Sequence, residues 1–277
     1  QVSVYLILGV GMTFVITSKG IDLSVGATFG FTAAVTADLI KNYGLNPYLA
    51  IPFAILFGAV LGSLIGLMVT KLKVNAFIAS LGMLTAYRGL THLYLGSDVI
   101  VRLPQEIVFL GQGFLGFIPV PALLSILVAL FGWWLLRYTR FGRYTVAIGS
   151  NESACRVVAG IHVNRYKIAI FAFAGAMAGF GSVLMIGRLN GTSAVLGHMY
   201  ELHVIASVVM GGTTLYGGRG TILGTFLGVY TIGIIENGMV LIGADFHTQR
   251  VLIGFLLVFA VAFQGYRERK KGVMESR

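Results

Sequence analysis

The chain has 277 residues, of which 57% are hydrophobic and 11% are charged, and its mean hydropathy is +0.88. Soluble domains contain about 45–50% apolar and about 25% charged residues, so this composition excludes an ordinary soluble domain. The net charge of +10 does not indicate a nucleic-acid partner, because the basic residues are scattered over loops, as in the cytoplasmic loops of membrane proteins.

Apolar segments of roughly 20 residues, the length that crosses the ~30 Å hydrocarbon core of a bilayer, recur along the chain. We expect an all-α fold, a polytopic transmembrane helical bundle of about nine spans with some short or broken helices, in one domain over residues 1–277. The expected spans are, in chain order, Val4–Thr17, the segment between the Ser18–Ser24 turn and Ile40, Tyr48–Val69, Ala76–Leu95, Pro121–Leu136, Ile168–Ile186, Leu202–Leu215, Thr221–Ile242 and Val251–Phe263.

The Lys and Arg residues orient this bundle. Most of them lie in alternate loops and in the tail, namely Ser18–Ser24, Lys71–Lys73, Arg137–Lys167, Tyr216–Gly220 and residues 266–277. The positive-inside rule places these segments, and the C-terminus, in the cytoplasm. Nine spans then leave Gln1 outside, so we expect one further helix before it and ten spans in a full-length protein.

Catalysis within the chain is not indicated. The five histidines are dispersed without a ligand-spaced pair, and the single Cys155 excludes a disulfide framework within the chain and a cysteine-rich metal site. The Gly-rich stretch Met210–Gly220 lacks the lysine of a phosphate-binding loop. We therefore expect a non-enzymatic protein without a cofactor or a bound metal.

Glycines at every fourth position predict close helix packing. The stripes are Gly58-Gly62-Gly66, Gly175-Gly179 and Gly220-Gly224-Gly228. In lipid, such small-residue stripes allow helix backbones to approach one another.

Five polar side chains lie within or at the edge of the expected spans, and they are Asp38, Arg88, Arg188, Glu236 and Asn237. Ionisable groups there are costly and usually face the bundle interior or a water-filled cavity. Arg88 and Glu236 are candidates for an ion pair between helices, either purely structural or with a ligand role. Asp38 and Arg188 lie near the outer ends of their spans, where they can reach water.

The segment Arg137–Lys167 contains the sharpest local pattern. Ser150 or Asn151 is a plausible N-cap, Glu152 suits the first turn, and Gly160 suits a left-handed C′ position. We expect a cytoplasmic helix of about two turns, which is too short to be stable alone. It needs a partner, either the membrane surface or another protein, and a protein groove is preferred. In the turn before the second span, Asp22 is expected to cap the helix that follows.

Three stretches coincide with a known family: Gly11–Gly26 with its Gly-Ile-Asp-Leu-Ser-Val-Gly motif, Gly142–Ile161, and Ile205–Thr221. Over essentially its whole length the chain resembles the membrane permease of bacterial ABC sugar importers, in the branch that handles ribose, xylose, galactofuranose and related sugars. Two departures are Ser150, where many relatives carry glycine, and Lys19, where they often carry a small residue.

The resemblance implies a site for the cytoplasmic ATPase and a path for the substrate. The expected ATPase-coupling residues are Gly149, Ser150, Asn151, Glu152, Ala154, Arg156, Gly160 and Ile161. The residues singled out for the translocation path or its structural motifs are Gly20, Asp22, Ser24, Arg88, Glu236, Asn237, Gly211, Gly212 and Thr213.

The resemblance also implies an assembly in the bacterial inner membrane. The expected partners are cytoplasmic ABC ATPase subunits, a second permease in a homodimer or related heterodimer, an extracellular or periplasmic sugar-binding protein, and the lipid bilayer. Two alternatives stay open: a sister ABC permease for branched-chain amino acids or nucleosides, and a secondary transporter or channel that acts alone.

Overall fold

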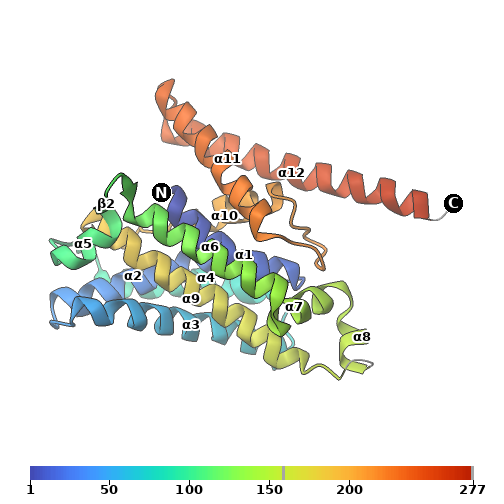
Figure 1. Ribbon diagram of the computed structural model, residues 1–277. Coiled ribbons are helices and arrows are strands. Elements are labelled where there is room, and N and C mark those ends of the chain that lie inside the picture. The colour runs from blue at the N-terminus through green and yellow to red at the C-terminus, as the bar shows by residue number, and fades with distance from the viewer. Residues whose placement is uncertain (158–159, 276–277) are drawn as a thin grey trace.

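The computed structural model describes residues 1–157 and 160–275, and it is a helical bundle (Figure 1). Its first half contains α1 (Val2–Thr17), α2 (Val25–Lys41), α3 (Pro47–Thr70), α4 (Ala76–Leu95), α5 (Gln105–Gln112) and α6 (Val120–Tyr138). Its second half contains α7 (Arg140–Ser150), α8 (Glu152–Val157), α9 (Val163–Leu189), α10 (Tyr200–Met210), α11 (Ile222–Leu241) and α12 (Phe246–Glu275).

Strand structure is confined to two small antiparallel pairs in the described part of the chain. β1 (Ile100–Val101) pairs with β4 (Gly191–Thr192), and β2 (Phe114–Leu115) pairs with β3 (Ile118–Pro119). Both pairs lie in connections between helices, so the expected all-α bundle is confirmed.

Among the described residues, four helices are long and apolar enough to cross a membrane by themselves: α3, α6, α9 and α11. Several other apolar helices are shorter, among them α1 with 16 residues and α10 with 11. The expected count of nine full spans is therefore not confirmed.

The predicted seventh span, Leu202–Leu215, differs most from the structure. Its helix is α10, which begins at Tyr200 and ends at Met210. At 1.5 Å per residue it covers only about 16 Å. The chain leaves the helix at Gly211, and Gly212 adopts a left-handed φ of 89° that breaks helical geometry.

The centre of the bundle is α1. Nearly all of its side chains are buried, and Leu6, Ile7 and Leu8 expose no surface. A helix that is apolar on every side is expected to be enclosed by other helices. In this bundle α6, α9, α10 and α11 pack around α1.

The predicted glycine stripes are confirmed as packing surfaces except at Gly220, which precedes α11 and lies against the side chains of Thr17 and Thr213. Gly58 and Gly62 of α3 lie against the backbone of Gly175 in α9, and Gly179 lies against the carbonyl of Ala54. In the eighth predicted span, Gly224 and Gly228 lie against the backbone of α10. A β-carbon at any of these sites would overlap a backbone atom, so glycine is required for the helices to meet this closely.

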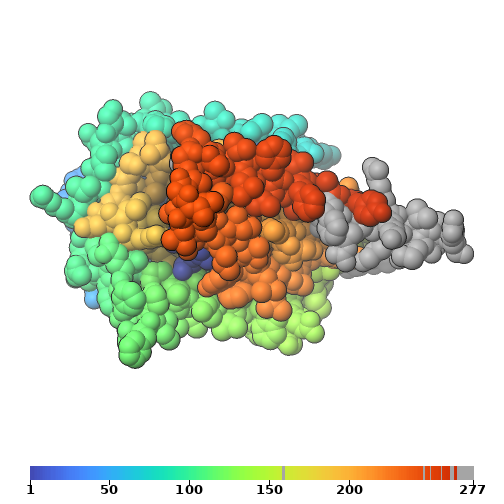
Figure 2. All heavy atoms as spheres, turned by 90° about the horizontal axis from the view of Figure 1, so that it is seen from above, coloured from blue at the N-terminus to red at the C-terminus, as the bar shows by residue number. Residues whose placement is uncertain are grey.

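The two ends of the bundle differ in structure. At one end lie α5 and the β2–β3 hairpin, and at the other lie α7 and α8, with the described C-terminal end of α12 extending in the same direction (Figure 1). α11 packs against α1 and α10, and α12 packs against α10, on the face of the bundle opposite α3 (Figure 1). Figure 2 looks onto that face, where the blue N-terminal residues are visible at the floor of a hollow beside α11 and α12.

Candidate functional site

The short helix predicted within Arg137–Lys167 exists as α8, and it is preceded by a second helix, α7, that the sequence pattern did not indicate. α7 is capped by Thr139, whose side chain accepts a hydrogen bond from the Gly142 backbone N–H at 3.3 Å. The helix is amphipathic, with buried Thr145 and Ile148 on one side. It packs against α6, α1 and α9, so it attaches the coupling segment to the bundle.

Asn151 is the N-cap of α8, and it is one of the two residues predicted for that position. Its Oδ1 accepts from the Ala154 backbone N–H at 3.0 Å and from the Ser153 hydroxyl at 2.8 Å. The other alternative, Ser150, is wrong, because Ser150 is the last residue of α7 and its hydroxyl donates to the Val146 carbonyl at 3.0 Å. In the expected coupling loop, residues 158 and 159 lie outside the described residues, as do residues 276 and 277 of the expected basic tail.

The left-handed conformation predicted for Gly160 is confirmed. Gly160 has φ +60°, and the Ile161 N–H donates back to the Cys155 carbonyl at 3.0 Å. This hydrogen bond holds the chain that follows Gly160 against α8. Ala154, in the middle of α8, is exposed on the surface of the helix.

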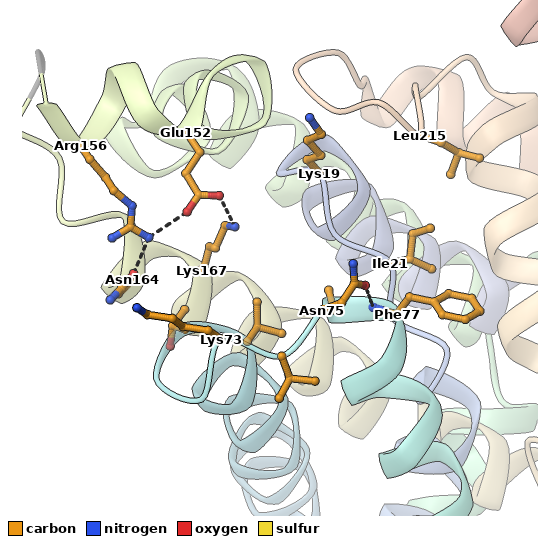
Figure 3. A pocket seen from close by; sticks show the side chains of 14 residues that line it. Lys19, Ile21, Lys73, Asn75, Phe77, Glu152, Arg156, Asn164, Lys167 and Leu215 are labelled. Carbon is orange, nitrogen blue, oxygen red and sulfur yellow. Dashed lines mark hydrogen bonds and ion pairs between the residues drawn. The ribbon is translucent and has the colours of Figure 1, made fainter.

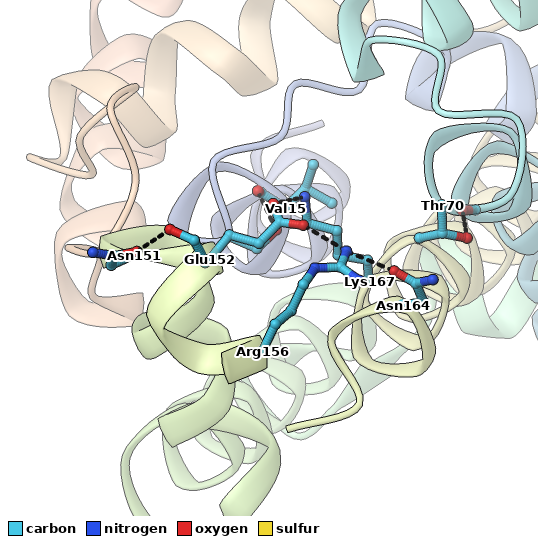
Figure 4. Close-up of polar contacts among 10 residues, drawn as sticks. Val15, Thr70, Asn151, Glu152, Arg156, Asn164 and Lys167 are labelled. Atoms are coloured by element: carbon cyan, nitrogen blue, oxygen red, sulfur yellow. Dashed lines mark hydrogen bonds and ion pairs between the residues drawn. The ribbon is translucent and has the colours of Figure 1, made fainter. Parts of the chain in front are cut away.

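A charged network ties α8 to the start of α9 (Figure 4). The Glu152 carboxylate accepts from Lys167 Nζ at 2.5 Å and from Arg156 at 2.8 Å, and Arg156 also donates to Asn164 Oδ1 at 2.7 Å. Partial burial opposes ionisation of Glu152, but the hydrogen bonds from Lys167 and Arg156 outweigh it, so the pKa of this carboxyl lies below its ordinary value. Glu152 is therefore ionised at neutral pH, and it joins two helices that are separated by a loop.

A backbone junction connects the coupling segment with the core. The Gly218 N–H donates to the Thr17 carbonyl at 2.8 Å. Gly149, near the end of α7, is wedged against the same carbonyl, and a β-carbon there would also lie 2.6 Å from the Gly218 nitrogen. The end of α1, the end of α7 and the Gly-rich turn before α11 thus meet through main-chain atoms, without side chains between them.

The Gly-rich segment also sets the spacing of α10 and α11. Gly211 lies against the Gly224 carbonyl, and Thr213 is fully buried. No atom lies within 4 Å of the position that a β-carbon on Gly212 would take, so close packing does not require glycine there. Its left-handed φ does, because that conformation disfavours other residues. Gly20, at the other side of this region, lies against Val15 and Phe171.

Asp22 and Ser24 form a buried turn, which corrects the predicted cap. The N-cap of α2 is Ser24, whose side chain makes no capping bond. Asp22 instead accepts from the Ser24 N–H at 2.8 Å and from the Ser24 hydroxyl at 2.6 Å. The carboxylate fixes the turn that precedes the helix, because it lies two residues too early to cap the first turn itself.

A cavity of about 1090 Å³ opens at the end of the bundle that holds the N-terminus of α1, between α1, α10, α11 and the start of α12. Its lining is aromatic and polar, including Tyr5, Tyr200, His203, Glu236 and Asn237. Two of the predicted path residues, Glu236 and Asn237, thus lie on one wall. Planar rings with a few fixed hydrogen-bonding groups suit a small polar ligand.

The predicted Arg88–Glu236 ion pair is wrong. Arg88 donates to the Leu196 carbonyl at 2.7 Å and, through its second terminal nitrogen, to the Gly197 carbonyl. Glu236 pairs with His203 Nε2 at 2.8 Å. Residues 193–199 are irregular backbone, so their carbonyls have no partners within a helix or strand. Inside a bundle such carbonyls must accept hydrogen bonds from other groups, and Arg88 supplies two of these donors.

Double-mutant analysis tests this rearrangement. We expect Arg88→Leu and Glu236→Leu to destabilise the protein additively, because the two residues share no partner. His203→Leu and Glu236→Leu should instead be less than additive, since either change alone breaks the same pair. The measurement is the thermal midpoint of each variant in detergent, and rescue of Arg88→Leu by Glu236→Leu would contradict the structure.

Sequence reasoning missed Lys167, His203 and the buried Glu201. Lys167 lies 15 residues from Glu152, and no local spacing relates them. His203 was grouped with dispersed histidines, although it lies one turn into a short helix. Glu201 precedes the predicted span, and only the earlier start of α10 places it inside the bundle.

Comparison with known proteins places this geometry in context. The family described as "Branched-chain amino acid transport system / permease component" matches residues 1–261. The ribose import permease protein of Bacillus subtilis (strain 168) is 42% identical over 273 residues, covering 98% of this chain and 83% of that protein.

Two further relatives are also named as sugar transport permeases. The ribose import permease protein of Escherichia coli (strain K12) is 38% identical, with 94% of this chain and 82% of the relative covered. The D-allose transport system permease protein of the same organism is 34% identical, with 95% and 80% covered. No solved structure matches the chain significantly.

Proposed function

Since the chain belongs to the ABC permease family that includes the ribose and allose import permeases, we propose that it forms the sugar path of an ATP-driven importer and couples that path to cytoplasmic ATPase subunits. It is a multi-pass protein of the bacterial inner membrane. The substrate class that we propose is a monosaccharide. The sister function, import of branched-chain amino acids or nucleosides, is less favoured because the relatives above are named for sugars.

The observation that carries the coupling role is the double attachment of α8. Through Glu152 and Lys167 it is tied to α9, and the preceding helix α7 is joined through its Gly149 to the end of α1 and to the turn before α11. A push on α8 therefore reaches three membrane helices. A transporter that acted alone would have no use for an exposed, separately capped helix of six residues.

The cavity at the N-terminus of α1 is the proposed outer entrance of the path. Its neutral aromatic rings and the Asn237 amide suit the faces and hydroxyls of a sugar delivered by a binding protein. α10 links this cavity with the Gly-rich segment, because Tyr200 and His203 near its start line the cavity and Gly211 at its end contacts Gly224. Movement at the junction can thus change the width of the cavity.

Reconstitution tests the proposal. The affinity-tagged permease is purified from its native host, and co-purifying subunits are identified by mass spectrometry. We expect an ABC ATPase in the complex, together with a second permease chain. In proteoliposomes, ATP hydrolysis should rise when the importer's binding protein is added with ribose, and recovery of the permease without any ATPase would overturn the proposal.

Accessibility labelling tests the orientation. In a Cys155→Ala background, we expect Phe117→Cys, at the fully exposed tip of the β2–β3 hairpin, to react with an impermeant maleimide in intact cells. Lys73→Cys should be protected until the membrane is permeabilised, because the basic end lies in the cytoplasm. Labelling of Lys73→Cys in intact cells would show that the chain has the opposite orientation to the proposed one.

A further inference from the structure

A second cavity, of about 760 Å³, lies at the basic end between α8 and the turns that follow α1 and α3 (Figure 3). Four cationic side chains line it: Lys19, Lys73, Arg156 and Lys167. Glu152 is the one acidic side chain in the lining. Lys19 and Lys73 take no part in the proposed coupling contacts of α8.

The charges in this cavity are incompletely matched. Glu152 is shared by Arg156 and Lys167, which form its two ion pairs. Lys19 and Lys73 enter no ion pair or side-chain hydrogen bond found among the described residues, and they approach from two different turns (Figure 3). The cavity therefore retains a positive charge that an anion can neutralise.

Two helix ends add to the positive potential. The 20-residue α4 begins at the cavity wall, where Asn75 caps the Phe77 N–H at 2.9 Å. The 27-residue α9 contributes Asn164 and Lys167 from its first two turns. The N-terminus of a helix carries a partial positive charge and favours phosphate-like anions.

Part of the lining is apolar. It includes Ile21, Val74, Phe77 and Leu215, so the cavity has an apolar wall beside its charged groups. Phe77 is 47% exposed, and the same exposed face of α4 continues with Ile78 at 62% and Leu81 at 45%. An apolar track thus runs from the cavity along the outside of the bundle in the direction of the membrane interior.

From this arrangement we propose that the cavity binds the phosphate headgroup of an anionic phospholipid, with its acyl chains along the exposed face of α4. The headgroup would lie between Lys19 and Lys73, beside α8. An acidic segment of a partner protein is less favoured, because it would have no use for the apolar track. Bound lipid would link the coupling helix to the α1–α2 and α3–α4 turns, so its occupancy would tune coupling to membrane composition.

Lipid titration of the purified full-length chain in a neutral detergent tests the site. The probes are dioctanoyl phosphatidylglycerol, dioctanoyl phosphatidylcholine and inorganic phosphate, and the readout is the thermal midpoint. We expect a saturable rise with phosphatidylglycerol and none with phosphatidylcholine. The Lys19→Gln/Lys73→Gln variant should bind phosphatidylglycerol at least fivefold more weakly, while Lys71→Gln, an exposed neighbour outside the cavity, should respond like the wild type.

Each other outcome overturns the assignment. An equal response of the wild type and the double variant would show nonspecific adsorption, and an equal shift with inorganic phosphate alone would assign the cavity to a free anion. Loss of ATPase recovery with an unchanged lipid response would assign the lysines to a protein contact. If the double variant does not fold, native mass spectrometry of the wild type, compared with Lys73→Gln, must show retained phosphatidylglycerol in the wild type and less of it in the variant.

Discussion

Ala154→Arg is expected to abolish sugar uptake while the membrane bundle stays folded. Ala154 lies exposed on α8, between the Asn151 cap and the left-handed Gly160. A small residue in that position lets a docking helix enter a groove, and an arginine adds bulk and charge at the contact. A buried, unpaired charge at an interface costs several kcal/mol, about 2–5, which corresponds to a loss of affinity of 30-fold or more.

The measurement is recovery of the ATPase with the tagged permease, together with uptake of labelled sugar. Ala154→Ser is the matched control, because it keeps a small side chain at the same position and should retain both properties. The thermal midpoint of Ala154→Arg should equal that of the wild type, since the side chain faces away from the bundle. Normal ATPase recovery and normal uptake with Ala154→Arg would refute the assignment of α8 as the coupling element.

Gly149→Ala is expected to reduce both stability and uptake through the backbone junction. Ala is the better helix former by about 0.5–1 kcal/mol. That gain is outweighed because the added β-carbon would overlap the Thr17 carbonyl and lie 2.6 Å from the Gly218 nitrogen. Overpacking of this kind costs about 1–3 kcal/mol, and it separates α7 from the end of α1.

Gly82→Ala is the control for the effect of alanine's higher helix propensity alone. Gly82 also lies within a helix, α4, but nothing lies within 4 Å of the position that its β-carbon would take. This variant should be neutral or slightly more stable. Uptake and the thermal midpoint are measured for both variants, and equal behaviour of Gly149→Ala and Gly82→Ala would remove the junction from the coupling mechanism.

Local sequence patterns were sufficient for the parts of this protein that depend on neighbouring residues. Asn151 specifies the start of α8 by its own side chain, and Gly160 specifies the left-handed turn after this helix by its own backbone freedom. The glycine stripes of α3 and α9 predicted close packing, because a four-residue spacing places glycines on one helix face. Composition identified a membrane protein, since hydropathy needs no knowledge of contacts.

Tertiary structure alone decided which polar groups meet. Arg88 and Glu236 were matched by opposite charge, yet Arg88 serves the carbonyls of a broken segment and Glu236 pairs with His203. The rotation of each helix about its axis sets these partners, and packing of whole helices determines that rotation. The short α10 follows the same principle: hydropathy continues to Leu215, but Gly211 and Gly212 end the helix where α11 packs against it. The junction of Thr17, Gly149 and Gly218 is likewise hidden in the sequence, because main-chain contacts between distant segments leave no periodic pattern of side chains.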